Sequence, residues 1–148
     1  MQRLQLLKTV IVTSPGPISD DAALVTNTID TAGYEEMLII FTVGAIDIVM
    51  TGLKLQESDL SNMGGATDVP SANFGVSGQG LPGATEDDLL FGIHVKLGGG
   101  GRKRYMDLLA TTGNGVAGTY ASCVAILSKS EISQSSISDR GFTRLLYA

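Results

Sequence analysis

The sequence has no tryptophan, a single cysteine and a single histidine, and these shortages restrict its chemistry. Cys123 has no partner for an intrachain disulfide and cannot build a thiolate metal cluster. It lies in the apolar stretch 121–127, where a buried structural thiol is expected. A catalytic cysteine or serine needs a base, and His94 is the one histidine for that role. We therefore predict a satisfied surface histidine and a protein that is not an enzyme.

Charge is also scarce, because only 17% of the residues are charged and the net charge is −5. Binding to DNA, RNA or an anionic membrane depends on neutralising phosphates with Lys and Arg. No apolar run is long enough to span a bilayer. The N-terminal apolar run is broken by Lys8 and lacks a small-residue cleavage site after it. We expect a soluble protein made in a reducing cytoplasm, with no nucleic-acid or membrane partner.

Glycine is abundant, with 19 residues, and the apolar segments between glycines show strand periodicity. Every second residue of 89–97 is apolar, which indicates a half-buried strand. The continuous apolar run 37–43 is typical of a central strand covered on both faces. Helix signals are weak in comparison. Further strands are predicted at residues 4–13, 49–57, 103–110 and 119–128.

These strands and glycine-rich turns predict an all-β fold, an antiparallel β-sandwich or jelly roll. The short segment 44–47 predicts a hairpin between the strands 37–43 and 49–57. The glycines 98–101 predict a second hairpin loop before 103–110. We expect the sandwich domain to cover 1–128, with one long loop at 58–88, and residues 129–148 to form an extended C-terminal arm.

Two glycine motifs resemble nucleotide sites but lack the required context. The glycines 98–101 precede a basic triplet and a strand, whereas a P-loop needs G-x-x-x-x-G-K-[ST] before a helix. Gly113, Gly115 and Gly118 form G-x-G-x-x-G without the strand–helix–strand unit of a dinucleotide fold. We interpret them as turn residues. The triplet Arg102, Lys103 and Arg104 is a candidate contact to an acidic partner surface.

Other motifs also fall short of a reactive site. Ser77 lies in GVSGQG, which lacks the last glycine of the nucleophile elbow. The acidic side chains in and beside the long loop lack a calcium-ligand spacing and are interpreted as a solvated rim. These are Asp59, Asp68, Glu86, Asp87 and Asp88. We predict no catalytic residue, no cofactor and no metal.

The long loop and the tail are the candidate partner-binding segments. Six glycines in 58–88 predict a loop that is mobile in the free protein and ordered on assembly. The tail is polar at first and ends in apolar side chains, which either pack on their own sandwich or bury against a neighbouring subunit. We favour the neighbour. The candidate contacts are Phe142, Leu145, Leu146 and Tyr147.

The order of four short motifs resembles small structural proteins of tailed bacteriophages. An Asp-Thr-x-Gly-Tyr stretch enters an apolar strand, a Leu-x-Glu-Ser-Asp arm follows, and a Gly-x-Lys-Arg-Tyr strand comes after a variable loop. The resemblance covers roughly residues 27–128, and it departs at the loop 58–88 and the long tail. The motifs are IDTAGYEEMLIIFTVGAI at 29–46, LKLQESD at 53–59, TDV at 67–69 and GGRKRYMDLLA at 100–110.

This resemblance implies a capsid decoration (cement) protein with a β-sandwich or jelly-roll fold. Such a protein would bind the phage major capsid protein on the capsid exterior of the virion, after synthesis in the host bacterial cytoplasm. It would also contact copies of itself, as a dimer or a trimer. The alternative is a receptor- or carbohydrate-binding virion module, although the four Tyr and four Phe offer few aromatic platforms. A small hydrolase is the weaker rival.

Overall fold

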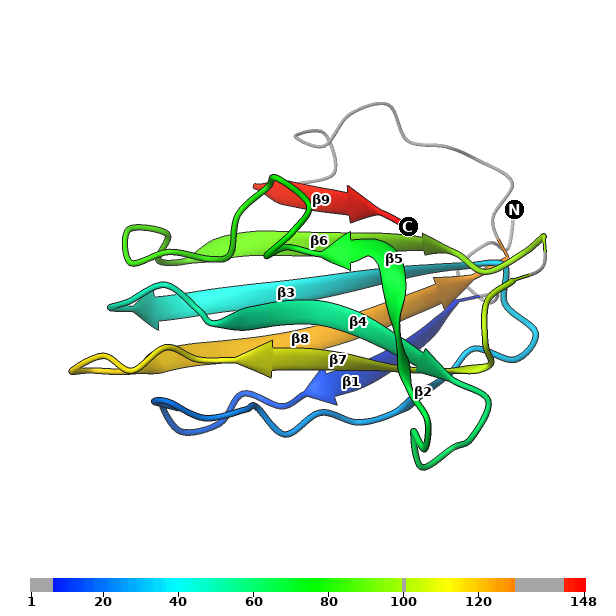
Figure 1. The fold of residues 1–148 in the computed structure, drawn as a ribbon, viewed down its shortest axis with the longest axis horizontal. Helices are drawn as coiled ribbons and strands as arrows, with labels where there is room; N and C mark the ends of the chain where they lie inside the picture. Colours follow the sequence, from blue (N-terminus) through cyan, green and yellow to red (C-terminus); the bar gives the residue numbers. More distant parts are fainter. Residues whose placement is uncertain (1–6, 100, 130–142) are drawn as a thin grey trace.

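The computed structural model describes residues 7–99, 101–129 and 143–148, and this part of the chain is all-β without a helix (Figure 1). The prediction of an all-β fold is confirmed. The strands are β1 (Lys8–Thr13), β2 (Ile29–Asp30), β3 (Glu36–Ile46), β4 (Gly52–Ser58), β5 (Thr67–Asn73), β6 (Leu89–Lys96), β7 (Tyr105–Thr111), β8 (Thr119–Ser128) and β9 (Arg144–Tyr147).

The strands form two sheets that pack together as a β-sandwich. Sheet A has the order β1-β8-β3-β6-β9, and sheet B has the order β2-β7-β4-β5. Alternate residues of each strand point inward, because successive side chains of a strand face opposite sides of the sheet. The inward residues of β3 and β8 are all buried. Phe74 and Phe91 meet edge to face in the core, with ring centroids 6.1 Å apart.

The first eight strands are paired in a nested way. Strand β4 pairs with β5, β3 with β6, β2 with β7 and β1 with β8, each time antiparallel. The arrangement resembles one long hairpin whose closed end lies at β4 and β5. The hairpin is rolled so that β8 also pairs with β3, and β7 with β4. Strand β9 lies outside this nest and pairs parallel to β6.

Both hairpins predicted from neighbouring strands are wrong. Strands β3 and β4 belong to different sheets, and residues 47–51 cross from one sheet to the other. Strands β6 and β7 are likewise in different sheets, so the glycines at 98–101 precede a crossing rather than closing a hairpin. The glycine pattern marks where the chain turns. The pattern does not show which strand pairs with which, because the partners of β3 lie far away in the sequence.

The glycines of the G-x-G-x-x-G match serve another crossing between the sheets, from β7 to β8. A Cβ at Gly113 would overlap the carbonyl oxygen of Val49, so the two crossing segments pack closely only with glycine there. The Asp47 carboxylate accepts hydrogen bonds from the backbone N–H groups of Val116 (2.5 Å) and Ala117 (2.6 Å). These bonds lower the pKa of Asp47, with the Ala117 N–H the largest cause.

The segment 58–88 is not one long loop, because it contains β5. This strand pairs with β4, and Val69, Ala72 and Phe74 in and after it are buried. The strand was not predicted from the sequence because Pro70 interrupts the pattern. The structure also shows an irregular backbone there, since Ser71 adopts a positive φ of 64°. Both features suit an edge strand, which is the position of β5 in sheet B. The predicted mobility of the remaining loop stays a prediction.

Candidate interaction surface

The outer face of sheet A carries an unusual set of apolar side chains. The outward residues of β3 and β8 include Leu38, Ile40, Val124 and Ile126, and each is partly exposed. Ile11 of β1 is 56% exposed. A sandwich sheet that faced only water would place polar residues at these positions. The apolar side chains therefore indicate a surface suited to contact with another apolar surface.

Strand register makes this surface continuous. Ile11 pairs with Val124, and Val124 pairs in turn with Ile40, so three apolar side chains form a row across β1, β8 and β3. Ile126 and Leu38 pair in the next row on the same face. Cross-strand pairs on one face have Cβ atoms about 4.5–5.5 Å apart, so these side chains touch or nearly touch. We call these five residues the sheet A patch.

The outer face of sheet B has a different character. Lys54 and Gln56 of β4 point outward, and both bind the Asp68 carboxylate at 2.9 Å. These bonds lower the pKa of Asp68, with the Gln56 amide the largest cause. Asp107 of β7 also lies on this face. Sheet B therefore carries charged side chains in the middle of its outer face, where sheet A carries hydrocarbon.

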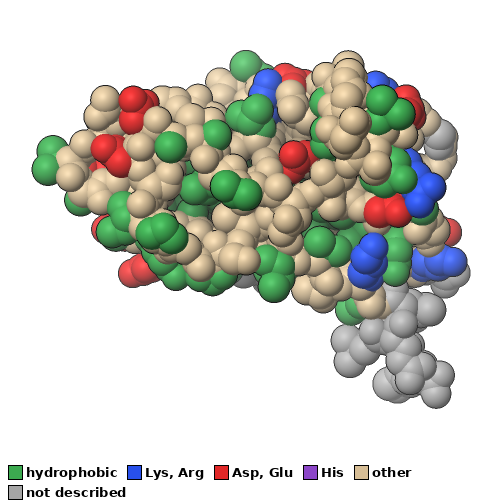
Figure 2. All heavy atoms as spheres, turned by 90° about the horizontal axis from the view of Figure 1, so that it is seen from below, with side chains coloured by type: hydrophobic (Ala, Val, Ile, Leu, Met, Phe, Trp, Pro, Cys, Tyr) green, Lys and Arg blue, Asp and Glu red, His purple; other side chains and the backbone are tan. Residues whose placement is uncertain are grey.

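The basic triplet has partners within the chain. The Arg102 guanidinium lies 3.4 Å from the Glu57 carboxylate, which also accepts the Lys103 backbone N–H. Arg104 donates two hydrogen bonds to Asp30, at 2.9 and 2.8 Å. Figure 2 shows most of the visible Lys and Arg side chains toward one end of the molecule, beside Asp and Glu.

These pairs have an electrostatic consequence for Asp30. The Arg104 hydrogen bonds are the main cause that holds the pKa of Asp30 well below its usual range, and the Ala32 N–H adds to the effect. The same pair raises the pKa of Arg104. The triplet therefore ties strands and loops together, while Arg104 keeps 54% of its side chain exposed. A role for the triplet in partner contact stays a prediction.

The structure corrects the interpretation of the apolar tail. Leu145 and Leu146 are 3% and 5% exposed and belong to β9, which pairs with β6 of the same chain. The Arg144 guanidinium binds the Glu86 carboxylate at 3.1 and 2.5 Å and holds β9 to the segment after β5. The end of the tail, Arg144–Tyr147, thus packs on its own sandwich, the alternative that we did not favour. Tyr147 is 55% exposed, and Phe142 lies outside the described residues.

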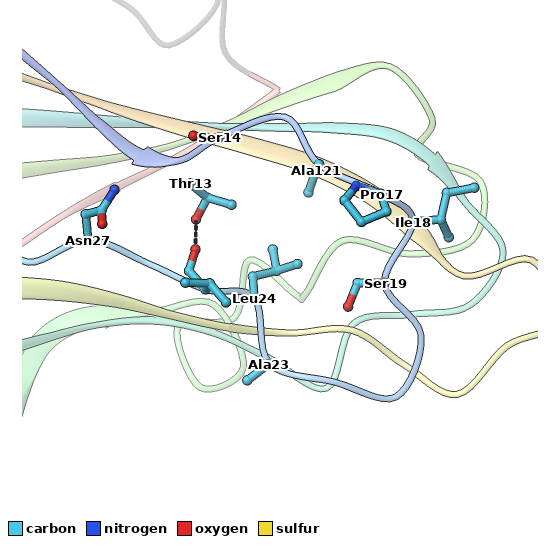
Figure 3. Close-up of a pocket in the computed structure, with 11 residues that line it drawn as sticks. Thr13, Ser14, Pro17, Ile18, Ser19, Ala23, Leu24, Asn27 and Ala121 are labelled. Carbon is cyan, nitrogen blue, oxygen red and sulfur yellow. Dashed lines mark hydrogen bonds between the residues drawn. The ribbon is translucent and has the colours of Figure 1, made fainter.

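A groove of about 450 Å³ lies beside β1, between the segment 14–27 and Ala121 of β8 (Figure 3). The Thr13 hydroxyl donates a hydrogen bond of 3.2 Å to the Val25 carbonyl and helps to hold the segment against β1. The residues that line the groove include no acid, base or thiol. Its chemistry suits packing or weak binding. The lining consists of Thr13, Ser14, Gly16, Pro17, Ile18, Ser19, Ala23, Leu24, Val25, Asn27 and Ala121.

The single cysteine and the single histidine lie on opposite faces of sheet A. Cys123 is buried, as predicted, and burial raises the pKa of its thiol. His94 lies in β6, with its Nε2 3.4 Å from the Glu36 carboxylate and its ring 5.6 Å from that of Tyr147. The prediction that His94 is satisfied holds only in part, because its buried Nδ1 has no hydrogen-bond partner.

The acidic residues near the long loop do not converge on one point. Asp68 binds Lys54, Glu86 binds Arg144, and the Asp87 carboxylate accepts the Ile46 backbone N–H at 2.9 Å. Across the described ranges, no group of three His, Cys, Asp or Glu side chains could hold a metal ion. Nor do those ranges contain a helix with the length and hydrophobicity that crossing a membrane requires.

Comparison with protein families, with curated proteins and with solved structures gives no match for this chain.

Sequence reasoning missed the sheet A patch as a site, although one signal pointed to it. The run 37–43 predicted a central strand covered on both faces, and β3 is indeed central in sheet A. Its inner face packs in the core. All strands of the described residues belong to the two sheets, so none of them covers the outer face. An apolar run with one face left open could have been interpreted as a contact surface.

Proposed function

We propose that this chain is a virion structural protein of a tailed bacteriophage, a decoration protein that binds the outside of an assembled capsid. The observation that carries the proposal is the nested pairing of β1 to β8. Apart from β9, the sheet orders β1-β8-β3-β6 and β2-β7-β4-β5 support the interpretation as a two-Greek-key jelly roll. Viral capsid and lectin domains use this architecture.

The surfaces of the molecule support a binding function. The sheet A patch offers hydrocarbon for contact between copies of the chain in such an assembly. The net charge of −5 suits a protein outside the shell, which has no need to neutralise packaged DNA. The motif order at 29–46, 53–59 and 100–110 resembles phage structural proteins. The partner in this proposal is the major capsid protein.

Co-sedimentation with assembled shells tests this function. Purified protein is mixed with DNA-free shells of the phage that encodes it and separated on a sucrose gradient. We expect saturable binding with a fixed number of copies per shell and a higher disruption temperature of the loaded shell. A charge-matched β-sandwich protein of similar size serves as the control. Binding to host cells or glycans without shell binding would favour a receptor-binding module instead.

A further inference from the structure

We propose that the outer face of sheet A is a self-association interface, on which a second copy of this chain packs face to face. The proposal rests on the sheet A patch and goes beyond capsid binding, because it holds whatever particle the protein joins. The patch combines an apolar centre with polar ends, where Ser128 and Glu36 lie at one end and Ser122 and Thr42 toward the other. Protein interfaces commonly have an apolar core and a polar rim.

Shape favours a second sheet as the occupant. Strands twist with a fixed hand, and two sheets with the same twist pack with their strands about 30° apart. A second copy supplies a sheet with an identical twist. A two-fold axis between β8 and β3 brings the two central strands of each copy together. The side chains of the patch then form the middle of the contact.

The area of the face reaches the minimum expected of a biological interface. Strands β3 and β8 have 11 and 10 residues, and β1 and β6 flank them. Four strands spaced 4.8 Å apart and about 30 Å long cover roughly 570 Å² per copy, or roughly 1,100 Å² for two copies. A biological interface is expected to exceed about 1,000 Å².

The charge pattern also suits contact of a surface with itself. In a two-fold interface, residues near the axis meet their own copies, so a charged residue there would face a like charge. The outward positions of β3 and β8 contain one charged residue, Glu36, at the end of the face. Lys96 and His94 of β6 lie beside Glu36 at that end, away from Ile40. The outer face of sheet B, with Lys54, Asp68 and Asp107, is poorly suited to such an interface.

Charged substitutions at the centre of each face test the proposal. We expect the unaltered chain to be a dimer in sedimentation velocity at micromolar concentration. Ile40→Lys should weaken the dimer at least about 100-fold, because two like charges meet at its centre. Ile40→Glu should do the same, and a mixture of the two variants should dimerise again. Leu109→Lys, on the outer face of sheet B and 37% exposed, is the matched control and should remain dimeric.

Several results would overturn the proposal. They are a monomeric unaltered chain at about 100 μM, a dimer that survives Ile40→Lys, and equal dissociation by Leu109→Lys. A monomer in which another segment of the chain covers the patch is among these outcomes. Circular dichroism verifies that each variant is folded. If Ile40→Lys does not fold, Ile126→Thr replaces it, because threonine keeps the strand preference. A folded Ile126→Thr variant with unchanged dimer affinity would also overturn the proposal.

Discussion

At the scale of single residues, glycine positions fall into two physically different groups. Gly113 allows the crossing 112–118 to lie against the crossing 47–51, since a Cβ there would overlap the Val49 carbonyl oxygen. A Cβ at Gly16 would make only an ordinary contact of 3.7 Å with the Ser14 carbonyl oxygen, and Gly16 has no positive φ. Gly113→Ala should therefore lower the free energy of unfolding by about 1–3 kcal/mol, the usual range for overpacking. Gly16→Ala should change it by less than about 0.5 kcal/mol. Urea unfolding of both variants measures the contrast, and equal effects would contradict it.

Asp30 offers a pH-dependent test at the same scale. Arg104 holds the pKa of Asp30 below its ordinary value of 3.8, because the folded state stabilises the ionised carboxylate. The resulting stability is complete above that ordinary value and is lost as the pH falls toward the folded pKa. The difference in melting temperature between the unaltered chain and Asp30→Asn should be constant above about pH 5 and shrink below about pH 4. A difference that grows on acidification would contradict this assignment.

At the scale of elements, β9 is the strand with the clearest test. Leu146 is 5% exposed and belongs to the core cluster, so Leu146→Ala should lower the free energy of unfolding by about 2–5 kcal/mol. Val76→Ala is the control, because Val76 is 80% exposed and should contribute less than about 0.5 kcal/mol. Denaturant titration at several protein concentrations makes the comparison. A loss that depended on protein concentration would point to a role between subunits instead.

The strands show how far periodicity predicts this fold. Residues 119–128 were predicted as a strand and form β8 with the same bounds, and 89–97 became β6 with one residue fewer. Period two is a local property, so a strand whose inward face is apolar can be recognised from its own residues. Strand β5 was missed because its sequence, TDVPSAN, has few apolar residues and contains a proline. An edge strand needs less apolar surface than a central one.

Strand partners could not be predicted from the same pattern. The chain pairs β3 with β6 and β8, and every connection that resembled a hairpin near β3 and β7 crosses between sheets. A turn with glycines permits a crossing as readily as a hairpin. For the candidate site, sequence identified Leu145 and Leu146 as buried contacts but assigned them to the wrong partner. An apolar pattern predicts that a side chain is buried, but the surface that buries it is determined by the tertiary structure.

At the scale of the whole molecule, the nested pairing sets an order of loop closures. Near the closed end of the nest, Glu57 of β4 pairs with Thr67 of β5. At the open end, Lys8 of β1 pairs with Leu127 of β8. Each doubling of loop length adds about 0.6 kcal/mol to the entropic cost of closure. Pairing first at the open end would thus cost about 2 kcal/mol more than pairing first at the closed end. We expect folding to begin near β4 and β5, and to proceed outward to β1 and β8.

This order predicts different kinetic effects for two core substitutions. Leu55 in β4 and Val12 in β1 are both fully buried, so alanine at either position should destabilise the protein measurably. Leu55→Ala should mainly slow folding, with a φ-value of about 0.5–0.8, because β4 is formed in the transition state. Val12→Ala should mainly accelerate unfolding, with a φ-value below about 0.3. Stopped-flow chevron plots give both values. A φ-value for Val12 equal to or above that for Leu55 would contradict this order. It would mean that folding begins in sheet A, where β1 pairs with β8 far away in the sequence.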